Sequence, residues 1–305
     1  MRARPTGASR SHPARGSYPS QGWRCGSYRL NTKKRPLIMG ILNITPDSFS
    51  DGGRFFTVQQ ALKQAIWMEQ DGADMIDIGG ESTRPGATPV TTEEELRRVL
   101  PVIKLLIKKL SIPLSIDTIK AEVARQAVDV GVSIINDISG LTRDPEMITV
   151  ASKSNAGLVI MHSKGNPQTM QKNPKYKNVL LEVYAFLERQ IKYAIGHGIS
   201  KNRIVIDPGI GFGKTVNHNL TLIKNLSYFI PLGVPILIGP SRKSFIRKVL
   251  NSTNQPFLEG TIEGTAAASA IAVFQGARIL RVHDVAYMRM ASQIADAVMK
   301  GKVSN

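Results

Sequence analysis

Polar residues that follow short apolar runs are the part of this sequence best suited to chemistry. Eight apolar runs each end at one polar residue and lead into a loop; these residues are Asn43, Asp77, Asp117, Asn136, His162, Asp207, Ser241 and His283. The side chains of Asp117, Asn136 and Asp207 suit the donor and acceptor edge of a heterocycle. Any one of them could instead cap a helix, but all three together favour a ligand site. Buried carboxylates need a positive partner, for which Lys243 is the candidate.

Basic residues near the end of the chain predict an anion site. Ser241-Arg-Lys-Ser244 opens an expected helix, and the free N–H groups of a helix N-terminus, with two cations beside them, suit a carboxylate or phosphate. Arg281 and His283 close another apolar run, and strand alternation directs both side chains to one face. The alternative for His283 is a hydrogen-bonded structural histidine.

Two long polar loops also carry candidate ligands. The loop that begins at Asn43 is rich in oxygen donors, which suit Mg²⁺ because this ion takes few protein ligands and keeps waters and substrate phosphates. Alternatively, Asn43 closes an Asx turn in an ordinary surface loop. The second loop holds Arg84 between small residues, where a guanidinium could bind an anion through two hydrogen bonds or be solvated. We expect Asp77 to support this second loop.

A glycine-rich segment resembles a nucleotide-binding loop without being one. Residues 207–215 approach the pattern G-x-x-x-x-G-K-[ST], but Pro208 stands where the first glycine is needed. We therefore do not expect ATP or GTP hydrolysis. The histidines lack zinc-ligand spacing, so a structural metal is not expected either. His162 stands alone at its strand end.

The elements that must position these residues alternate regularly. The apolar runs predict strands at Leu37–Asn43, Met75–Ile78, Pro113–Asp117, Ser133–Asn136, Gly157–Met161, Arg203–Asp207, Pro235–Gly239 and Arg278–Val282. Helical patterns follow them at Ala61–Asp71, Thr92–Lys109 (with Thr92 and Glu95 as a capping box), Lys120–Asp129, Pro145–Ser154, Val179–Gly196, Asn217–Tyr228, from Lys243, Gly264–Gln275 and Asp284–Lys300. This alternation predicts an α/β fold, a single-domain (β/α)8 TIM barrel over residues 36–300. An open doubly wound sheet would need a G-x-G-x-x-G turn after the first strand, and none is there.

The first 35 residues differ from the rest of the chain. They contain nine arginines and lysines and no acid, and so account for about half of the net charge of +17. With many polar residues, glycines and prolines, residues 1–35 are expected to form a disordered basic tail. A solvated extension is the favoured interpretation, and nucleic-acid or membrane-surface binding and an organelle transit peptide are the alternatives.

The cysteine content and the apolar runs of the sequence indicate where the protein is located and which kinds of partner it has. A single cysteine, Cys25, cannot form an intramolecular disulfide, and no signal peptide is evident, so we expect a cytoplasmic protein. No apolar run approaches the length that crosses a bilayer. We therefore expect small-molecule substrates, with neither nucleic acid nor membrane as partner.

The chain from Pro36 to Lys300 resembles dihydropteroate synthase, the pterin-binding enzyme family of folate biosynthesis that sulfonamides inhibit. The resemblance rests on long motifs in the family's order: residues 41–53, residues 77–86, Ile134-Ile-Asn-Asp137, Asp207-Pro-Gly, Gly211-Phe-Gly-Lys214, Ser241-Arg-Lys-Ser244 and Arg281-Val-His-Asp284. It implies a Mg²⁺-dependent transferase that condenses (7,8-dihydropterin-6-yl)methyl diphosphate with 4-aminobenzoate to give 7,8-dihydropteroate and pyrophosphate. A homodimer through the last helices is also implied.

The resemblance assigns roles to matching positions. The implied pterin contacts are Asp117, Asn136, Met161, Asp207, Gly239, Lys243 and Arg281. Those to pyrophosphate are Asn43, Arg84, Arg281 and His283, with Mg²⁺ on Asn43, and those to aminobenzoate are Phe49, Thr83, Pro85, Phe212, Lys243 and Ser244. The implied catalytic group is Asp117, Asp207, Lys243, Arg281 and His283.

Departures from the family pattern are modest. Pro240 precedes the Ser-Arg-Lys motif, and Ile210 replaces a frequent aromatic residue, so the aminobenzoate pocket could differ in shape. A methyltransferase that binds a pterin and methylates a corrinoid would share the Asp/Asn slot but would have no use for Arg281 and His283. A catalytically silent pterin-binding homologue should have lost residues such as Arg84, which is present.

Overall fold

A closed barrel of eight parallel strands forms the centre of the molecule. The computed structural model describes residues 22–44, 58–82, 86–165, 169–251 and 261–302. Around the barrel the strands are β8 (Ile204–Asp207), β7 (Gly157–Met161), β6 (Ile134–Asp137), β5 (Leu114–Asp117), β4 (Met75–Gly79), β3 (Leu37–Asn43), β10 (Ile279–Val282) and β9 (Leu237–Ile238). A parallel bridge between Ile206 and Ile236 joins the two ends of this order. The predicted barrel is therefore confirmed.

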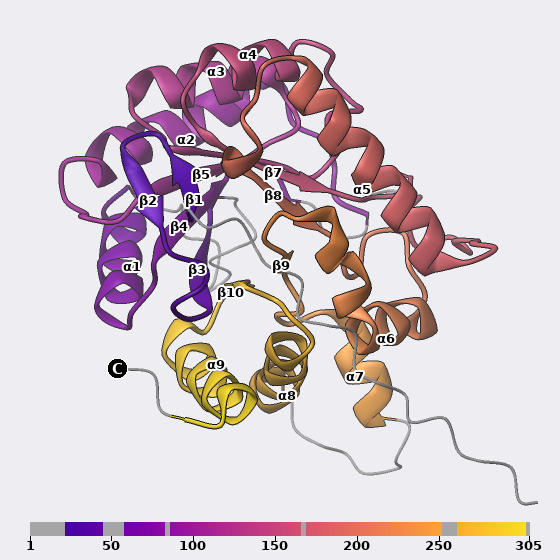
Figure 1. Cartoon of the computed structure of the whole chain (residues 1–305). Coiled ribbons are helices and arrows are strands. Elements are labelled where there is room, and N and C mark those ends of the chain that lie inside the picture. Colours follow the sequence, from indigo (N-terminus) through magenta and orange to yellow (C-terminus); the bar gives the residue numbers. More distant parts are fainter. Residues whose placement is uncertain (1–21, 45–57, 83–85, 166–168, 252–260, 303–305) are drawn as a thin grey trace, which may run out of the picture.

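Helices surround the strands (Figure 1). They are α1 (Val58–Gln70), α2 (Thr92–Leu106), α3 (Ala121–Val130), α4 (Met147–Lys153), α5 (Val179–Gly196), α6 (Val216–Lys224), α7 (Ser244–Asn251), α8 (Thr261–Phe274) and α9 (Val285–Lys300). The expected helix over residues 217–228 is wrong at its end, because α6 stops at Lys224 and a 3₁₀ helix, Leu226–Leu232, contains Pro231. The cap of α2 is one residue earlier than expected, since the Thr91 hydroxyl accepts from the Glu94 N–H at 3.2 Å. None of the described helices is long and apolar enough to cross a membrane.

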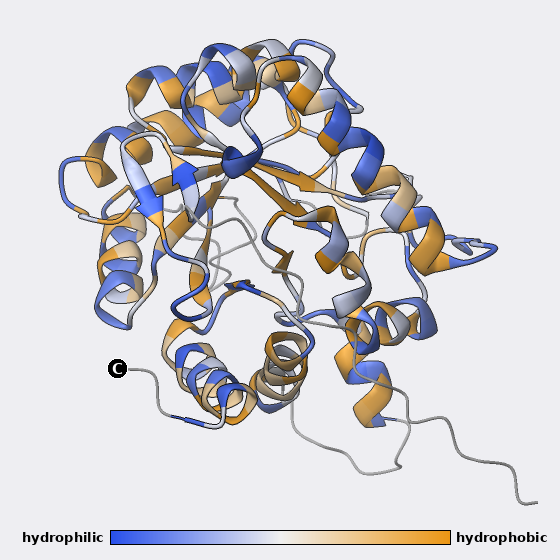
Figure 2. Ribbon diagram, in the orientation of Figure 1, coloured by the Kyte–Doolittle hydropathy of each residue, from blue (hydrophilic) through white to orange (hydrophobic). Residues whose placement is uncertain are grey.

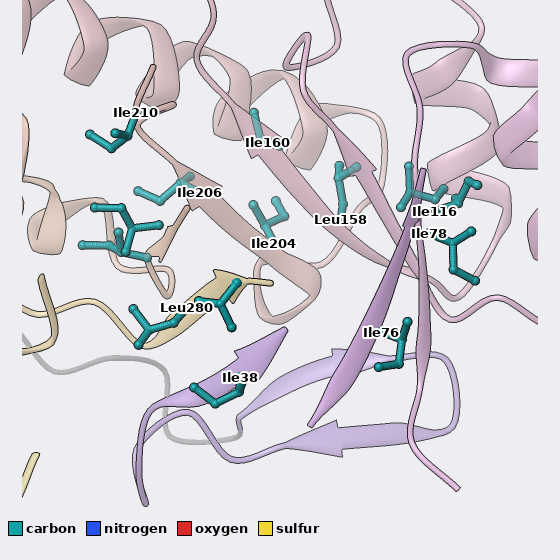
Figure 3. Close-up of a cluster of buried hydrophobic side chains, with 14 of the residues drawn as sticks. Ile38, Ile76, Ile78, Ile116, Leu158, Ile160, Ile204, Ile206, Ile210 and Leu280 are labelled. Atoms are coloured by element: carbon teal, nitrogen blue, oxygen red, sulfur yellow. The ribbon is translucent and has the colours of Figure 1, made fainter. Parts of the chain in front are cut away.

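Both faces of the strands are buried, which explains their nearly continuous apolar sequence. Residues at alternate positions point outward and pack under the helices, as Ile38, Ile76, Ile116, Leu158, Ile204 and Leu280 do in Figure 3. In Figure 2 the same strands stand out as hydrophobic, whereas the helices are mixed in hydropathy. The outer layer of the core thus anchors each strand against a helix.

The barrel interior near the starts of the strands is also apolar. Inward-facing residues near the strand starts form a second cluster, whose members include Met39, Met75, Ile134, Val159, Val205, Leu237 and Ile279. A hairpin of β1 (Trp23–Cys25) and β2 (Tyr28–Leu30) covers this cluster, with Trp23 and Cys25 fully buried in it. The Trp23 Nε1–H donates to the Arg203 carbonyl at 2.9 Å. The hairpin thus closes the end of the barrel where the strands begin.

The expectation of a disordered tail is wrong for residues 22–35. Trp23 and Cys25 are two residues apart on one strand, so both enter the core from the same face. Arg35, at the end of this segment, pairs with Asp74 at 2.6 Å. The basic, polar composition concealed a short amphipathic strand, and the open barrel end supplies the apolar surface that it covers. Residues 1–21 lie outside the described part of the chain.

Candidate active site

A layer of mainly polar side chains, called the polar layer below, fills the barrel interior near the ends of the strands. Six strands each contribute one residue to this layer, two positions after a residue of the apolar cluster near the strand starts. These residues are Asp77, Asn136, Met161, Asp207, Gly239 and Arg281. A separation of two keeps side chains on the same face of a strand. The last residue of β5, Asp117, joins the layer through its contact with Arg281. Six of the seven predicted pterin contacts, all except Lys243, thus come together from the ends of separate strands.

Arg281 lies between two carboxylates within this layer. Its Nε donates to Asp77 Oδ2 and its Nη2 donates to Asp117 Oδ2, both at 2.6 Å. The Asn136 amide donates through Nδ2 to the same Asp77 oxygen at 2.9 Å. One hydrogen-bonded network therefore joins β4, β5, β6 and β10.

Buried carboxylates and buried cations lie together in this site. Asp77, Asp117 and Asp207 share it with Arg281 and Lys243, and the charge of Lys214 also acts on Asp207. Burial, opposed by the charge of Arg281 and reinforced by that of Asp77, raises the pKa of Asp117 to about 7. Burial likewise raises the pKa of Asp207 to about 6, against the hydrogen bond that it accepts from the Gly209 N–H at 2.6 Å. The arrangement suits a ligand that brings hydrogen-bond donors or positive charge.

The two basic side chains respond differently to burial. Burial lowers the pKa of Lys243 to about 8, and the positive charge of Arg281 acts in the same direction. Burial alone would lower the pKa of Arg281 as well, but the carboxylates of Asp77 and Asp117 outweigh burial and raise it. Arg281 therefore stays charged, whereas Lys243 can lose its proton near neutral pH.

Lys243 lies against an aromatic wall. Its Nζ is 4.1 Å from the centroid of the Phe212 ring, a distance that allows a cation–π contact. Gly211 makes this approach possible, because a Cβ there would lie 2.9 Å from Lys243 Cδ. Lys243 therefore contacts the Phe212 ring and also lies close enough to Asp117 and Asp207 for their charges to raise its pKa. These carboxylates and that of Asp77 are called the carboxylate layer below.

The expected anion site at residues 241–244 is only partly present. Arg242 pairs with Asp284 at 2.6 Å, so a carboxylate already matches the charge of one of the two expected cations. The Ser241 hydroxyl lies 2.9 Å from His283 Nδ1 and accepts from the His283 backbone N–H at 3.2 Å. These bonds join the start of the α7 segment to the end of β10 and hold His283 in place.

The glycine-rich segment after β8 packs against the loop after β7. A Cβ on Gly209 would lie 1.9 Å from the His162 carbonyl oxygen, and one on Gly213 would lie 2.2 Å from that of Lys164. These glycines allow two backbones to touch, which explains their spacing without a bound phosphate. Lys214 is buried and its Nζ contacts His162 Nδ1 and the Phe212 carbonyl oxygen, each at 3.0 Å.

A cavity of about 250 Å³ opens beside Asp117. The described residues that line it include Glu81, Thr118, Lys120, Ile138, Met170 and Phe212. A second hollow of about 360 Å³, bordered by Ser244 and Lys248, contains none of the carboxylates. The first cavity is therefore the one that leads to the polar layer.

Asn43, the last residue of β3, lies at the edge of this layer. Its backbone is paired with Gly79, and a Cβ on Gly79 would lie 3.5 Å from Asn43 Oδ1 and 3.8 Å from the Asp117 carboxylate. Glycine thus keeps the space between these two side chains open. Four predicted contacts, Phe49, Thr83, Arg84 and Pro85, lie outside the described residues.

Asp77 is the residue that sequence reasoning underestimated. We expected it to support the following loop, but its carboxylate faces the barrel interior and contacts Arg281 and Asn136. The available signal was its position two residues after Met75 on the same strand. The His162 ring contacts Lys214, and Met161, which the resemblance names as the pterin contact at this strand end, stays a prediction.

The sequence pattern of a known family covers this barrel and its polar layer. The pattern of the pterin-binding enzymes matches residues 39–283, from β3 to the end of β10. The chain belongs to the pterin-binding enzyme family. Membership agrees with the resemblance in the sequence motifs and with a site rich in carboxylates.

Relatives within this family are dihydropteroate synthases. The enzyme of Synechocystis sp. is 48% identical over 267 residues, which are 88% of this chain and 91% of the relative. The enzyme of Escherichia coli is 43% identical, with 88% and 93% covered. Among solved structures, Yersinia pestis dihydropteroate synthase in a sulfonamide complex superposes with a TM-score of 0.84 at 40% identity, covering 91% of this chain and 98% of that one. The Xanthomonas albilineans enzyme in complex with 7,8-dihydropteroate has a TM-score of 0.79 at 41% identity, with 90% and 97% covered.

Proposed function

We propose that this protein is a dihydropteroate synthase. It joins (7,8-dihydropterin-6-yl)methyl diphosphate to 4-aminobenzoate and releases pyrophosphate, and it is a transferase of folate biosynthesis. The observation that carries the proposal is the buried layer in which Asp117, Asn136 and Asp207 lie with Arg281 and Lys243 beside an open cavity. Dihydropteroate synthases that match nearly the full length of the barrel support it.

The pterin occupies the carboxylate layer. Asp117, Asn136 and Asp207 bind its donor and acceptor edge, while Met161, Gly239, Lys243 and Arg281 border the ring. As the bond between the methylene carbon and the diphosphate oxygen breaks, positive charge develops on the pterin. The carboxylates of Asp117 and Asp207 stabilise that charge.

Aminobenzoate attacks the methylene carbon with the lone pair of its amine. The new carbon–nitrogen bond forms as diphosphate leaves, and the amine then releases one proton. An aromatic amine is already a neutral nucleophile, so no side chain has to activate it. We assign its contacts to Phe212, Lys243 and Ser244, and to Phe49, Thr83 and Pro85 outside the described residues.

The leaving diphosphate is assigned to Asn43, Arg84, Arg281 and His283. The Nε and Nη2 atoms of Arg281 already donate to carboxylates, so Nη1 is the nitrogen that can contact diphosphate. His283 is held at the end of β10 by Ser241, whose hydroxyl lies 2.9 Å from its Nδ1. Arg84 lies outside the described residues.

Mg²⁺ fits the edge of this site at Asn43. Among the described residues no three acidic, histidine or cysteine side chains gather as a metal site, but Mg²⁺ with a diphosphate needs few protein ligands. The glycine at position 79 keeps the space beside Asn43 Oδ1 open. When bound, the ion would neutralise charge on the departing diphosphate.

A homodimer through α8 and α9 is the proposed assembly. These helices lie side by side (Figure 1) and carry large apolar side chains that are half exposed or more, namely Ile271, Phe274, Tyr287, Met290, Ile294 and Val298. Apolar surface of this kind is typical of subunit interfaces. The cytoplasmic location expected from the sequence stays a prediction.

Turnover tests the proposed activity directly. The purified protein, supplied with the pterin diphosphate, 4-aminobenzoate and Mg²⁺, should form equal amounts of dihydropteroate and pyrophosphate. A protein that binds the pterin diphosphate without forming product at any Mg²⁺ concentration would instead be a silent pterin-binding homologue. Methyl transfer to a corrinoid would identify it as a methyltransferase.

A further inference from the structure

We propose that Asp77 is the positioning residue of the pterin slot, acting on the ligand through Asn136 and Arg281 without contacting it. This inference rests on the proposed function and adds a residue that none of the assigned contacts includes. Asp77 has no exposed surface, so a ligand in the cavity does not reach its carboxylate. Its effect on a ligand must therefore pass through the side chains that it holds.

One carboxylate oxygen of Asp77 connects side chains from two other strands of the barrel. Asp77 Oδ2 accepts from Arg281 Nε at 2.6 Å and from Asn136 Nδ2 at 2.9 Å. Asp77 lies on β4, and its two partners lie on β6 and β10, each two strands away in opposite directions around the barrel. A single carboxylate therefore sets the relative position of two side chains that no local segment connects.

Asp77 also selects what Asn136 presents to the ligand. An asparagine amide can turn either its oxygen or its nitrogen toward a neighbour, but an ionised carboxylate only accepts hydrogen bonds. The NH₂ group of Asn136 must therefore face Asp77, and its carbonyl oxygen is directed away from it. In this orientation Asn136 offers the ligand an acceptor, together with its second N–H.

Arg281 is held in the same way. Asp77 binds its Nε and Asp117 binds its Nη2, so the two carboxylates fix the plane of the guanidinium. The charge of Asp77 also offsets that of Arg281. Asp117 itself faces Arg281, Asp77, Glu95 and Lys243.

Support of the loop after β4 does not account for this carboxylate. In the described part of the chain, Asp77 Oδ2 bonds only to the interior side chains Asn136 and Arg281, and Oδ1 is buried without a hydrogen-bond partner. A buried carboxylate oxygen that lacks a partner costs stability. Such a group is expected where function, rather than folding, maintains it.

The test is a double-mutant cycle on binding of the pterin diphosphate alone, measured by calorimetry. Asp77→Asn should raise its dissociation constant by about 10- to 100-fold, the range seen for outer-shell partners of other sites. Asp77 acts through two partners, so Asp77→Asn should cost less binding on an Asn136→Ala background, and less on an Arg281→Ala background, than in the wild-type protein. The matched control is Asp74→Asn, three residues earlier, which removes a carboxylate paired with Arg35 and Arg289 and should leave the dissociation constant unchanged.

Additive effects on both backgrounds, or unchanged binding in Asp77→Asn, would overturn the positioning role. A crystal structure of Asp77→Asn adds a readout that needs no ligand: the Asn136 amide or the Arg281 guanidinium should reorient, and unchanged positions would contradict the proposal. If Asp77→Asn does not fold, Asp77→Ser, a smaller acceptor, serves for the same cycle. A wild-type protein that binds the pterin diphosphate but forms no dihydropteroate would refute the synthase activity, while the binding cycle would still decide the role of Asp77.

Discussion

At the scale of single residues, burial sets the charges on which the proposed reaction depends. Asp117 and Asp207 are buried carboxylates whose pKa values are raised, and Lys243 is a buried amine whose pKa is lowered. Their charged forms are therefore all present only in a narrow range near neutrality. Activity should consequently depend on pH more sharply than in a site with exposed groups.

A bell-shaped pH profile of kcat/KM is the expected result. As pH falls through about 7 and then about 6, Asp117 and Asp207 take up protons, and the negative charge that stabilises the cationic pterin is lost. As pH rises through about 8, Lys243 loses its positive charge. Rates measured with both substrates should be highest between these limits. A profile that stays flat from about pH 5 to about pH 9, roughly one unit beyond the lowest and the highest of these pKa values, would contradict these assignments.

At the scale of elements, the loops after β7 and β8 act as one packed unit. Lys214 contacts His162 on one loop and Phe212 on the other, and burial lowers the pKa of His162, so that its ring is neutral and accepts the hydrogen bond. Phe212 is an expected wall of the aminobenzoate pocket. The position of that wall therefore depends on a lysine outside the pocket.

Lys214→Met should weaken aminobenzoate binding selectively. Loss of the Nζ contacts releases the Phe212 backbone, so the KM for aminobenzoate should rise by about tenfold, equivalent to roughly 1.4 kcal/mol. The dissociation constant of the pterin diphosphate should change less, because Lys214 acts on Asp207 only through its charge and its hydrogen bonds go to His162 and Phe212. Steady-state kinetics separates the two effects, and Lys224→Met, at the end of α6, is the control. Equal losses for both substrates would mean that Lys214 has only a general structural role.

The N-terminal hairpin should govern stability but not chemistry. Trp23 is fully buried beneath the barrel, so Trp23→Ala should lower the free energy of unfolding by about 3–5 kcal/mol. Because the hairpin lies at the end of the barrel opposite the carboxylate layer, kcat per folded molecule should stay near the wild-type value. Denaturant unfolding and kinetics below the melting temperature check both statements, with the exposed Arg29→Ala as the control. A large fall in kcat would show that the two barrel ends are coupled.

At the scale of the whole molecule, the proposed interface on α8 and α9 decides the oligomeric state. Ile294 is 69% exposed on α9, and a charge placed within an apolar interface is poorly solvated. Ile294→Glu should therefore shift the protein toward the monomer in light scattering coupled to size-exclusion chromatography. Leu181→Glu, on the 54% exposed Leu181 of α5, should not. A monomeric wild-type protein would refute the assembly.

Most elements were predictable because their causes are local. β3, β7 and α5 have the predicted bounds, since their apolar periodicity and flanking turn residues suffice to define them. The short β9 and the end of α6 differ from expectation because Pro235 and Pro231 alter the backbone pattern there. The hairpin of residues 23–30 was missed because its stability comes from a barrel end that is distant in the chain.

The sequence by itself determined the barrel, the family and the residues that end its strands, because these depend on periodicity and on motifs that are continuous in the chain. Only the tertiary structure decided which of those residues form hydrogen bonds with one another and how their charges interact. Asp77, Asn136 and Arg281 are 59 to 204 residues apart along the chain, and no local pattern records which of them will meet. Barrel closure brings them within hydrogen-bond distance, and burial then makes each charge depend on its neighbours.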